Sequence, residues 1–260
     1  MKRKYLLLLL VCAVLLNGGP VLADGDFYVV AGGGGVGTKI SSLPYTINFP
    51  GFYYLGGNLT YTGTSEAITV NADDVTLDLM GFSLNSASRH TGNGIFITEQ
   101  KNVEIRNGTV RGFNFALAET SSNGANHRVI NVRVIDNNVG VTLSGQGHLI
   151  KGCMAANNTT DGLGIGSNGT IIGNVAQTCG GKGIIGSGTV SGNMVSDCGY
   201  GIYFNGAGRL IGNTVVCNSG QTGFYISTHI ALVDQNTVSG AGTHKTGGAT
   251  GAVYGTNPGF

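Results

Sequence analysis

Short runs of β-branched and other apolar residues alternate with polar residues along most of the chain, and they stop at Gly, Asn or Asp. Residues 171–175, 190–195 and 210–215 are three such runs, and each carries a Gly-Asn pair after its first apolar residues. Alternation with a period of two is typical of β-strands, and no stretch shows the 3.6-residue period of an amphipathic helix. The pattern therefore predicts strands and turns.

Two series of marks repeat along the chain at intervals of roughly 18 to 24 residues, the range of solenoid coils. In the first series a Gly precedes an apolar residue, and its members are Gly94, Gly140, Gly162, Gly183, Gly201 and Gly223, with Ala116 in the one long gap. The second series consists of asparagines, namely Asn107, Asn131, Asn174, Asn193, Asn213 and Asn236, with Cys153 near the position of the missing member. The two series interleave, so each coil carries one mark of each.

A coil of this length has room for three short strands and three turns, and stacked coils pair in parallel about 4.8 Å apart. The sequence has neither the hexapeptide repeat of a left-handed β-helix nor the Gly-rich nonapeptides of a calcium-binding β-roll. We therefore expect an all-β protein, a single-stranded right-handed parallel β-helix of roughly 8–10 coils with an N-terminal cap.

The repeated Gly and Asn have a structural explanation. A corner between strands often requires a positive φ, which Gly adopts freely and Asn more readily than most residues. Stacked Asn side chains can also hydrogen-bond from coil to coil and satisfy amides that the strand ladders leave over. The six asparagines are therefore expected to form a structural ladder.

Four segments are expected along the chain. Residues 1–23 have the basic start, apolar stretch and small-residue cleavage site of a signal peptide, so we expect cleavage near Ala23 and a secreted or periplasmic protein. Residues 24–60 are expected to form the N-terminal cap and first coil, and residues 61–240 the β-helix. Residues 241–260 are a Gly/Thr-rich tail that either closes the other end loosely or is disordered.

Charge is sparse. Charged residues make up 10% of the chain and hydrophobic residues 41%, while glycine accounts for 47 positions and proline for four. Loss of the signal peptide removes three basic residues, which turns the net charge of +1 into −2. No nucleic-acid partner is implied, and no membrane span remains after cleavage.

The chain resembles the right-handed parallel β-helix proteins of the pectin-lyase-like superfamily. The resemblance rests on residues 70–82, on residues 102–110, and on the Gly-Ile and Asn-Thr-Val coils that follow. The resemblance implies an association with extended polysaccharides, since the superfamily includes lyases, hydrolases, epimerases and phage tailspikes. The superfamily also includes a periplasmic copper-maturation protein. Calcium as a cofactor is implied by this resemblance alone, and no cofactor is evident from the residues. Fold by itself does not fix function.

A strip of basic residues is the candidate binding surface. Arg forks can hold the carboxylates of an acidic polysaccharide, and Asp78, Glu104 and Asp136 lie near enough in the repeat to neutralise part of such a strip. The candidate polysaccharide-binding residues are Arg106, Arg111, His127, Arg128, Arg133, His148 and Lys151.

Catalytic and metal signatures are weak. Asp73-Asp74 is the sole acidic pair, and it is typical of a turn between strands. His127 and His148 are one coil apart and are expected to stack roughly 5 Å from each other, but no third metal ligand follows at matching spacing, so no metal site is predicted. Cys153, Cys179, Cys198 and Cys217 are consistent either with a disulfide or with buried free thiols.

The sequence is consistent with two functions. The first is a secreted β-helix that binds an extended polysaccharide, either without changing it or with processing by a lyase-, hydrolase- or epimerase-like reaction. The alternative is a non-enzymatic structural or adhesive surface protein. The absence of Trp counts somewhat against sugar binding, although Tyr200, Tyr203 and Tyr225 could supply the aromatic faces.

Overall fold

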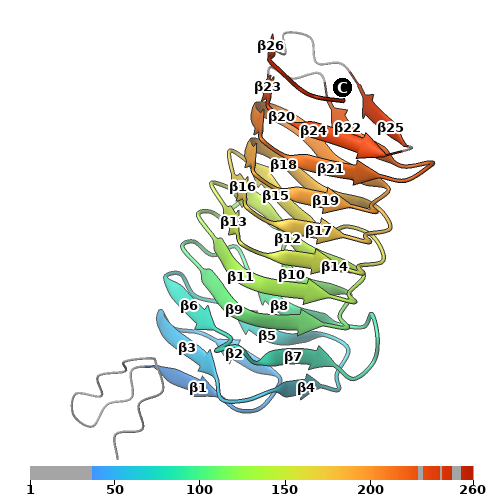
Figure 1. Ribbon diagram of the computed structural model, residues 1–260. Helices are drawn as coiled ribbons and strands as arrows, with labels where there is room; N and C mark the ends of the chain where they lie inside the picture. Colours follow the sequence, from blue (N-terminus) through green and yellow to red (C-terminus); the bar gives the residue numbers. More distant parts are fainter. Residues whose placement is uncertain (1–36, 228–230, 241, 248–252, 260) are drawn as a thin grey trace, which may run out of the picture. The chain divides into compact units, whose positions relative to one another are not determined.

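The computed structural model describes residues 37–227, 231–240, 242–247 and 253–259, which form a right-handed parallel β-helix of about nine coils (Figure 1). The described residues contain strands and turns but no helix, and so no helix that could cross a membrane. The signal peptide expected at residues 1–23, and residues 24–36 of the expected cap, lie outside the described residues.

Each coil contributes to three parallel sheets, and long strands bend from one sheet into the next. The first sheet contains β1 (Thr38–Ile40), β3 (Gly51–Leu55), β6 (Val75–Asp78), the starts of β9 (Glu104–Arg111) and β11 (Arg128–Ile135), β13 (Leu149–Lys151), β16 (Thr170–Ile172), the ends of β18 (Lys182–Ser191) and β20 (Tyr200–Ile211), β23 (Ala231–Asp234) and β26 (Val253–Tyr254). The second sheet contains β4 (Leu59–Tyr61), β7 (Ser83–Ser86), the ends of β9 and β11, β14 (Met154–Ala156), β17 (Val175–Gln177), β19 (Met194–Ser196), β21 (Thr214–Cys217) and β24 (Thr237–Gly240). The third sheet contains β2 (Tyr45–Ile47), β5 (Glu66–Val70), β8 (Asn93–Ile97), β10 (Phe115–Glu119), β12 (Val139–Gln146), β15 (Leu163–Ser167), the starts of β18 and β20, β22 (Thr222–Ile226) and β25 (Thr243–Thr246).

The interior is filled by columns of apolar side chains, one position per coil. In the first sheet the register aligns Leu77, Ile105, Val129, Ile150, Ile171, Val190, Leu210 and Val233, all fully buried. Because strand side chains alternate between faces, every second residue of these runs points outward. This explains the alternating pattern of the sequence.

Three corners separate the sheets, and we number each after the sheet that it follows. All three use one device: a residue with positive φ is followed by a side chain that turns inward and accepts a backbone N–H from the preceding coil. At the first corner Gly192 has a φ of 62° and Asn193 follows it. Asn193 Oδ1 accepts the N–H of Asn174 at 3.0 Å, and Asn193 Nδ2 donates to the carbonyl of Ile171 at 3.0 Å. The corner amides that leave the strand ladders are satisfied in this way.

The structure places four of the six expected ladder residues in this column. Asn174, Asn193, Asn213 and Asn236 are each at most 2% exposed and bond in series, and Cys153 N–H donates to Asn174 Oδ1. Asn107 and Asn131 differ from the expectation, since they stand one residue earlier, at the positive-φ position that Gly152 occupies in the next coil. They shape the corner but do not belong to the ladder.

The repeating Gly-apolar series has a different cause from the one expected. The glycines of this series enter the third sheet without a positive φ, and a Cβ on Gly162 would lie 2.4 Å from the carbonyl oxygen of Gly183 and 3.1 Å from Cys179 Sγ. Close stacking of successive coils, rather than backbone dihedral strain, therefore excludes a side chain there.

The two segments at the ends join the coil stack. Strands β1 to β4 pair in parallel with the next coil, so the part of the expected cap from Thr38 onward is already in register. In the expected tail, β25 pairs with β22 and β26 with β23, and Asn257 Oδ1 accepts the N–H of Asn236 at 3.1 Å. The described residues of the tail thus extend the first-corner ladder.

Gly162→Ala should destabilise the protein by about 1–3 kcal/mol, because the new methyl group has no room between coils. Gly57→Ala is the matched control, since a Cβ there meets nothing within 4 Å. Urea unfolding followed by circular dichroism measures both variants. Equal midpoints for the two would contradict the steric explanation.

Candidate functional site

The residues of the expected basic strip are distributed over two faces. Arg106, Arg128 and Lys151 lie on the first sheet, whereas Arg111 and Arg133 lie on the second, beyond the first corner. The structure therefore does not bring the five cations together into one strip.

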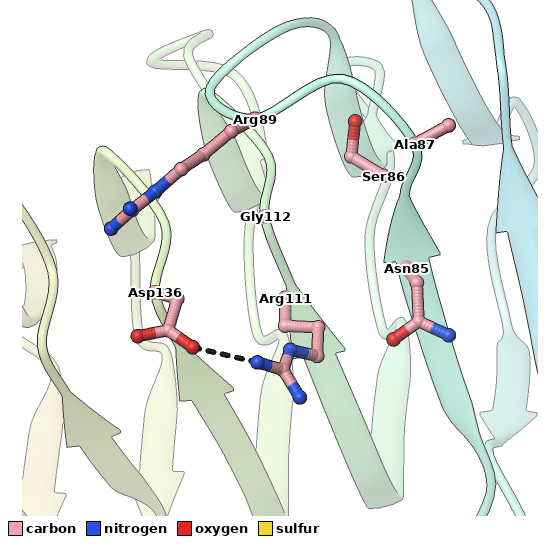
Figure 2. A pocket seen from close by; sticks show the side chains of 7 residues that line it. All are labelled: Asn85, Ser86, Ala87, Arg89, Arg111, Gly112 and Asp136. Carbon is pink, nitrogen blue, oxygen red and sulfur yellow. Dashed lines mark hydrogen bonds and ion pairs between the residues drawn. The ribbon is translucent and has the colours of Figure 1, made fainter.

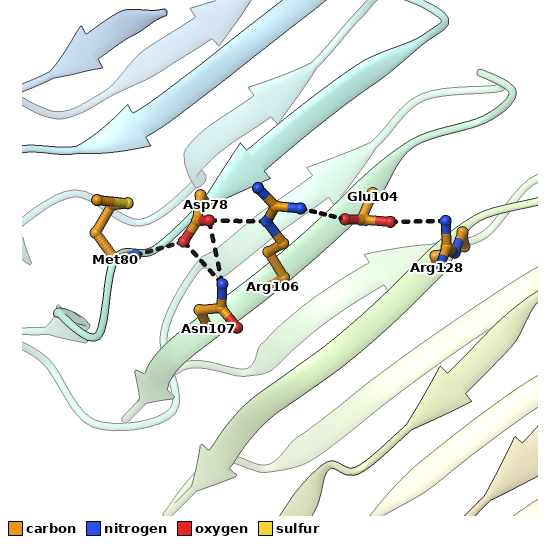
Figure 3. A network of polar contacts seen from close by, with 6 residues as sticks. All are labelled: Asp78, Met80, Glu104, Arg106, Asn107 and Arg128. Carbon is orange, nitrogen blue, oxygen red and sulfur yellow. Dashed lines mark hydrogen bonds and ion pairs between the residues drawn. The ribbon is translucent and has the colours of Figure 1, made fainter. Parts of the chain in front are cut away.

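Carboxylates neutralise the arginines of the first sheet (Figure 3). Asp78 Oδ2 accepts Arg106 Nε at 2.7 Å, and Glu104 bridges Arg106 and Arg128 with contacts of 3.0 Å to each. Asp78 also accepts the N–H of Met80 at 2.8 Å. The hydrogen bond to Asp78 is the main reason why the pKa of Arg106 is raised. This row of alternating charges favours a structural role over binding of an acidic polymer.

Two further basic residues of the expected strip, Arg133 and Lys151, are both exposed. Arg133 Nε donates to Thr109 Oγ1 at 3.0 Å. Lys151 lies in register between the apolar residues Ile130 and Ile172, so its outward neighbours supply no polar group for a ligand.

A polar hollow lies at the second corner, where the chain passes from the second sheet to the third (Figure 2). It has a volume of about 390 Å³ and is lined by Asn85, Ser86, Ala87, Arg89, Arg111, Gly112 and Asp136. Arg111 Nη2 contacts Asp136 Oδ2 at 2.8 Å, and Arg89 projects from the loop after β7. We call it the Arg89 hollow; it offers guanidinium, amide, hydroxyl and carboxylate groups to one ligand.

Further along the same corner lies a second polar hollow of about 300 Å³, which we call the Gln221 hollow. Its lining residues are Asn158, Thr159, Thr178, Cys179, Gly180, Asp197, Gly199 and Gln221. The loop that carries Arg89 reaches it, because His90 Nε2 lies 3.5 Å from Thr159 Oγ1. The two hollows thus follow one another along the helix axis over six coil steps, or about 29 Å at roughly 4.8 Å per step.

Sequence reasoning missed Arg89, although a signal for it was present. The interval between the paired core residues Ile68 and Ile95 is longer than later intervals such as Ile184 to Ile202. The extra residues form the loop that positions Arg89. A coil longer than its neighbours marks an outward loop, and such loops are where a solenoid can carry binding groups.

His127 and His148 lie in the interior, with exposures of 0% and 1%. Their rings stack with centroids 4.9 Å apart, as expected from the spacing. His127 Nδ1 accepts the N–H of Val103 at 3.2 Å, and His148 Nδ1 accepts the N–H of His127 at 3.1 Å. The two histidines are the ladder residues of the third corner. They cannot touch a polysaccharide, and we remove them from the candidate binding surface.

A buried carboxylate faces this histidine pair. Glu119 is fully buried, and its Oε2 accepts the N–H groups of Ser144 and Gly145 at 2.9 and 3.0 Å and lies 3.9 Å from His148 Nε2. Glu119 Oε1 and the Nε2 atoms of His127 and His148 have no hydrogen-bond partner. Burial lowers the pKa of each histidine to about 4, with the neighbouring imidazole adding to the effect at His127.

The geometry of this cluster does not suit a metal ion. The imidazole rings are stacked and nearly parallel, with an interplanar angle of 13°, so their Nε2 lone pairs run alongside one another. A shared metal would need both nitrogens to converge on one point at about 2.0–2.1 Å. Within the part of the chain that the structure describes, no three His, Cys, Asp or Glu side chains are grouped so that they could hold a metal ion.

The four cysteines among the described residues, Cys153, Cys179, Cys198 and Cys217, are buried free thiols. Cys179 and Cys198 occupy the ladder position of the second corner after Asn137 and Asn158, and Cys179 N–H lies 3.4 Å from Cys198 Sγ. Desolvation raises the pKa of Cys153 to about 11, so this thiol is protonated at neutral pH. Cys153, Cys179 and Cys198 thus stand at ladder positions where other coils carry Asn.

Asp73-Asp74 forms a turn, as the sequence indicates. Asp74 has a φ of 55°, and Asp73 Oδ1 accepts the N–H of Lys101 at 2.8 Å. Neither residue lines the hollows of the second corner.

Comparison with known proteins yields one family. Residues 65–244, more than half of the chain, match the family described as periplasmic copper-binding protein (NosD). No curated protein matches the chain.

Solved structures share the fold at low sequence identity. The enzymatically active domain of tailspike protein 2 of bacteriophage CBA120 superposes with a TM-score of 0.56 at 16% identity, covering 79% of this chain and 39% of the tailspike. The A-module of the mannuronan C-5 epimerase AlgE4 of Azotobacter vinelandii gives 0.51 at 10% identity, covering 82% and 83%. The Dettilon tailspike gives 0.52 at 16% identity, covering 85% and 59%. The chain therefore spans less than two thirds of either tailspike, and these likenesses show the parallel β-helix fold.

The buried histidines should make stability depend on pH. Because the folded state holds them neutral, unfolding is favoured as pH falls from about 6.5, their ordinary pKa, to about 4. At about pH 4 each histidine thereby lowers the free energy of unfolding by about 3 kcal/mol. The carboxylate of Asp73 partly opposes the lowering of the His127 pKa.

The double variant His127→Asn/His148→Asn keeps ladder acceptors that do not titrate. In this variant the loss of urea resistance between pH 7 and 4.5 should be smaller than in the unmodified protein. His90→Asn, at a loop position, is the control, and a pH dependence unchanged in the double variant would refute this assignment.

Proposed function

This chain belongs to the NosD family of parallel β-helix proteins, and from its own surface we propose that it binds an extended polysaccharide along the second corner of the β-helix. The observation that carries the proposal is the succession of the Arg89 hollow and the Gln221 hollow along one edge. A polymer that runs parallel to the helix axis meets both in turn. Hydroxyl, amide and carboxylate groups in both linings suit hydroxyl-rich ligands, which exchange water for protein hydrogen bonds.

Charge supports acidic sugars at the Arg89 hollow. Arg89 and Arg111 provide two guanidinium groups, and Asp136 neutralises one of them. A uronate carboxylate can be held by Arg89 in the bidentate manner that guanidinium favours. The mannuronan epimerase among the structural relatives acts on a polymer of this kind, by its name.

The proposal is binding rather than catalysis. Hydrolysis of a glycosidic bond ordinarily uses two carboxyl groups about 5–9.5 Å apart. In the Arg89 hollow Asp136 is the one carboxylate among the described lining residues, and it is tied to Arg111.

The copper of the family description does not enter the proposal. The described residues provide no fitting donor set, since the buried histidines use Nδ1 in the ladder and their Nε2 atoms do not converge. Calcium, which the superfamily resemblance implied, likewise finds no grouped carboxylates in the described ranges.

The family description as periplasmic supports export of this chain. Export places the protein where extracellular and cell-wall polysaccharides are found. We expect the mature protein to begin after Ala23, and intact mass measurement of the exported chain tests this directly.

Arg89→Gln and Arg111→Gln should each weaken binding to an oligouronate by about 5- to 10-fold, the loss of one charge-assisted hydrogen bond. Affinity is measured by calorimetry with oligomannuronate and oligogalacturonate after a screen of immobilised acidic and neutral polysaccharides. Arg209→Gln is the control, since this exposed arginine lies on the first sheet, away from the second corner.

Two results would overturn the proposal. If the unmodified protein binds no polysaccharide in the screen, the structural or adhesive rod is the better description. If it binds but both arginine variants behave like Arg209→Gln, the ligand lies elsewhere on the surface.

A further inference from the structure

Three tyrosines form an aromatic cluster on the outward face of the third sheet. Tyr203 on β20 pairs in register with Tyr225 on β22, and their rings stack with centroids 4.4 Å apart and an interplanar angle of 7°. Tyr200 stands edge-on to both, at 6.0 and 6.2 Å, and is 39% exposed.

The core does not need these rings. On the same strands the inward positions are filled by Ile202 and Phe224, which are fully buried. Large aromatic side chains that are left on the surface of a protein are a common mark of a binding surface.

The surface drops away in front of the tyrosine cluster. In register with Tyr203, the preceding coil carries Ile185 and the coil before that carries Gly164. Along this column the side chain therefore shortens from tyrosine to isoleucine, and glycine has no side chain. The column thus places an aromatic wall beside the shorter Ile185 and the side-chain-free Gly164, a step that can receive a ring-shaped ligand.

Polar groups lie at the other end of the same strands. A hollow of about 400 Å³ is lined by Ser187, Asn168 and Asn205, together with Ile165, Gly166, Ser167, Gly206 and Ala207. Ser187 and Asn205 follow Ile185 and Tyr203 by two residues, so by alternation they face outward on the same side. Amide and hydroxyl groups here can donate to and accept from a polyol.

The charges beside the cluster balance. Lys182 Nζ lies 5.3 Å from the Tyr203 ring centroid, and Asp161 Oδ2 lies 3.9 Å from the same nitrogen. Desolvation and the neighbouring tyrosines raise the pKa of Tyr203, so its hydroxyl is neutral at physiological pH. A neutral ligand meets no uncompensated charge here, in contrast to the Arg89 hollow.

We propose that the tyrosine cluster and the Asn205 hollow form a subsite for a neutral pyranose with equatorial hydroxyls, as in a β-1,4-linked glucan. Such a ring exposes axial C–H groups on its faces, which pack on an aromatic wall, while its equatorial hydroxyls reach the amides at its rim. The subsite deepens the proposed polysaccharide binding and rests on it, since Tyr200 directly follows Gly199 of the Gln221 hollow. One polymer could thus present uronates to Arg89 and a neutral sugar to the tyrosines.

Calorimetric titration with cellohexaose tests this subsite directly. The unmodified protein should bind cellohexaose more tightly than the α-linked maltohexaose. Tyr203→Ala should weaken cellohexaose binding by about tenfold, the equivalent of roughly 1.4 kcal/mol, and Tyr203→Phe, which keeps the ring stack, should lose less than threefold. Tyr254→Ala is the matched control, because Tyr254 is an exposed tyrosine (40%) on the first sheet that also contacts a lysine.

The outcomes separate this inference from the proposed function. Failure of the unmodified protein to bind cellohexaose, or equal affinity in Tyr203→Ala and Tyr254→Ala, overturns the tyrosine subsite. Binding of oligouronate through Arg89 and Arg111 would stand in either case, because Tyr203→Ala leaves that hollow intact. Circular dichroism and the urea midpoint show whether each variant is folded. Asn205→Ala provides a second variant of the subsite in which no aromatic ring is removed.

Discussion

The structure depends on satisfying the backbone amides where the chain turns each corner. Parallel strand ladders satisfy the amides within the sheets, but every coil leaves three corners whose inward N–H groups are cut off from water. Stacked side chains accept them one coil away: Asn193 at the first corner, Asn158 at the second and His148 at the third. A buried amide without a partner would cost about 1–3 kcal/mol, so these ladders fix the bends of the coils that carry them.

With the corners fixed, the interior and the exterior have separate roles. Columns of aliphatic residues, Asn, Cys and His fill the inside, and all four described cysteines and both stacked histidines belong to it. The outward positions and the loops are free to vary without disturbing the stack. The loop of Arg89 and the surface tyrosines are of this kind, which is why binding is assigned to them.

Much of this could be predicted from the sequence, because a repeated constraint leaves a repeated mark. The strand pattern and the coil length indicated the fold, and the spacing of His127 and His148 indicated their stacking. Their inward direction could also have been found: strand alternation that turns Arg128 outward turns His127 inward, in register with Val103. Asn107 and Asn131 were misplaced by one residue because Asn suits both the positive-φ position and the ladder position that follows it. The repeat spacing indicated that Asp78, Glu104 and Asp136 could neutralise part of the basic strip, and the structure pairs them with Arg106 and Arg111. Which carboxylate meets which arginine could not be predicted, since it depends on loop lengths that set which side chains lie across the sheet.

In the proposed function, one edge of the β-helix and the adjoining third sheet hold a single extended polysaccharide. The most direct test is a crystal structure of the mature protein with an oligosaccharide that contains both β-1,4-linked glucose and glucuronate. We expect a glucuronate carboxylate at Arg89, and a glucose ring against Tyr203 with its hydroxyls at Asn205. Sugar rings seated instead on the first sheet, at the row of Asp78, Arg106 and Glu104, would contradict it.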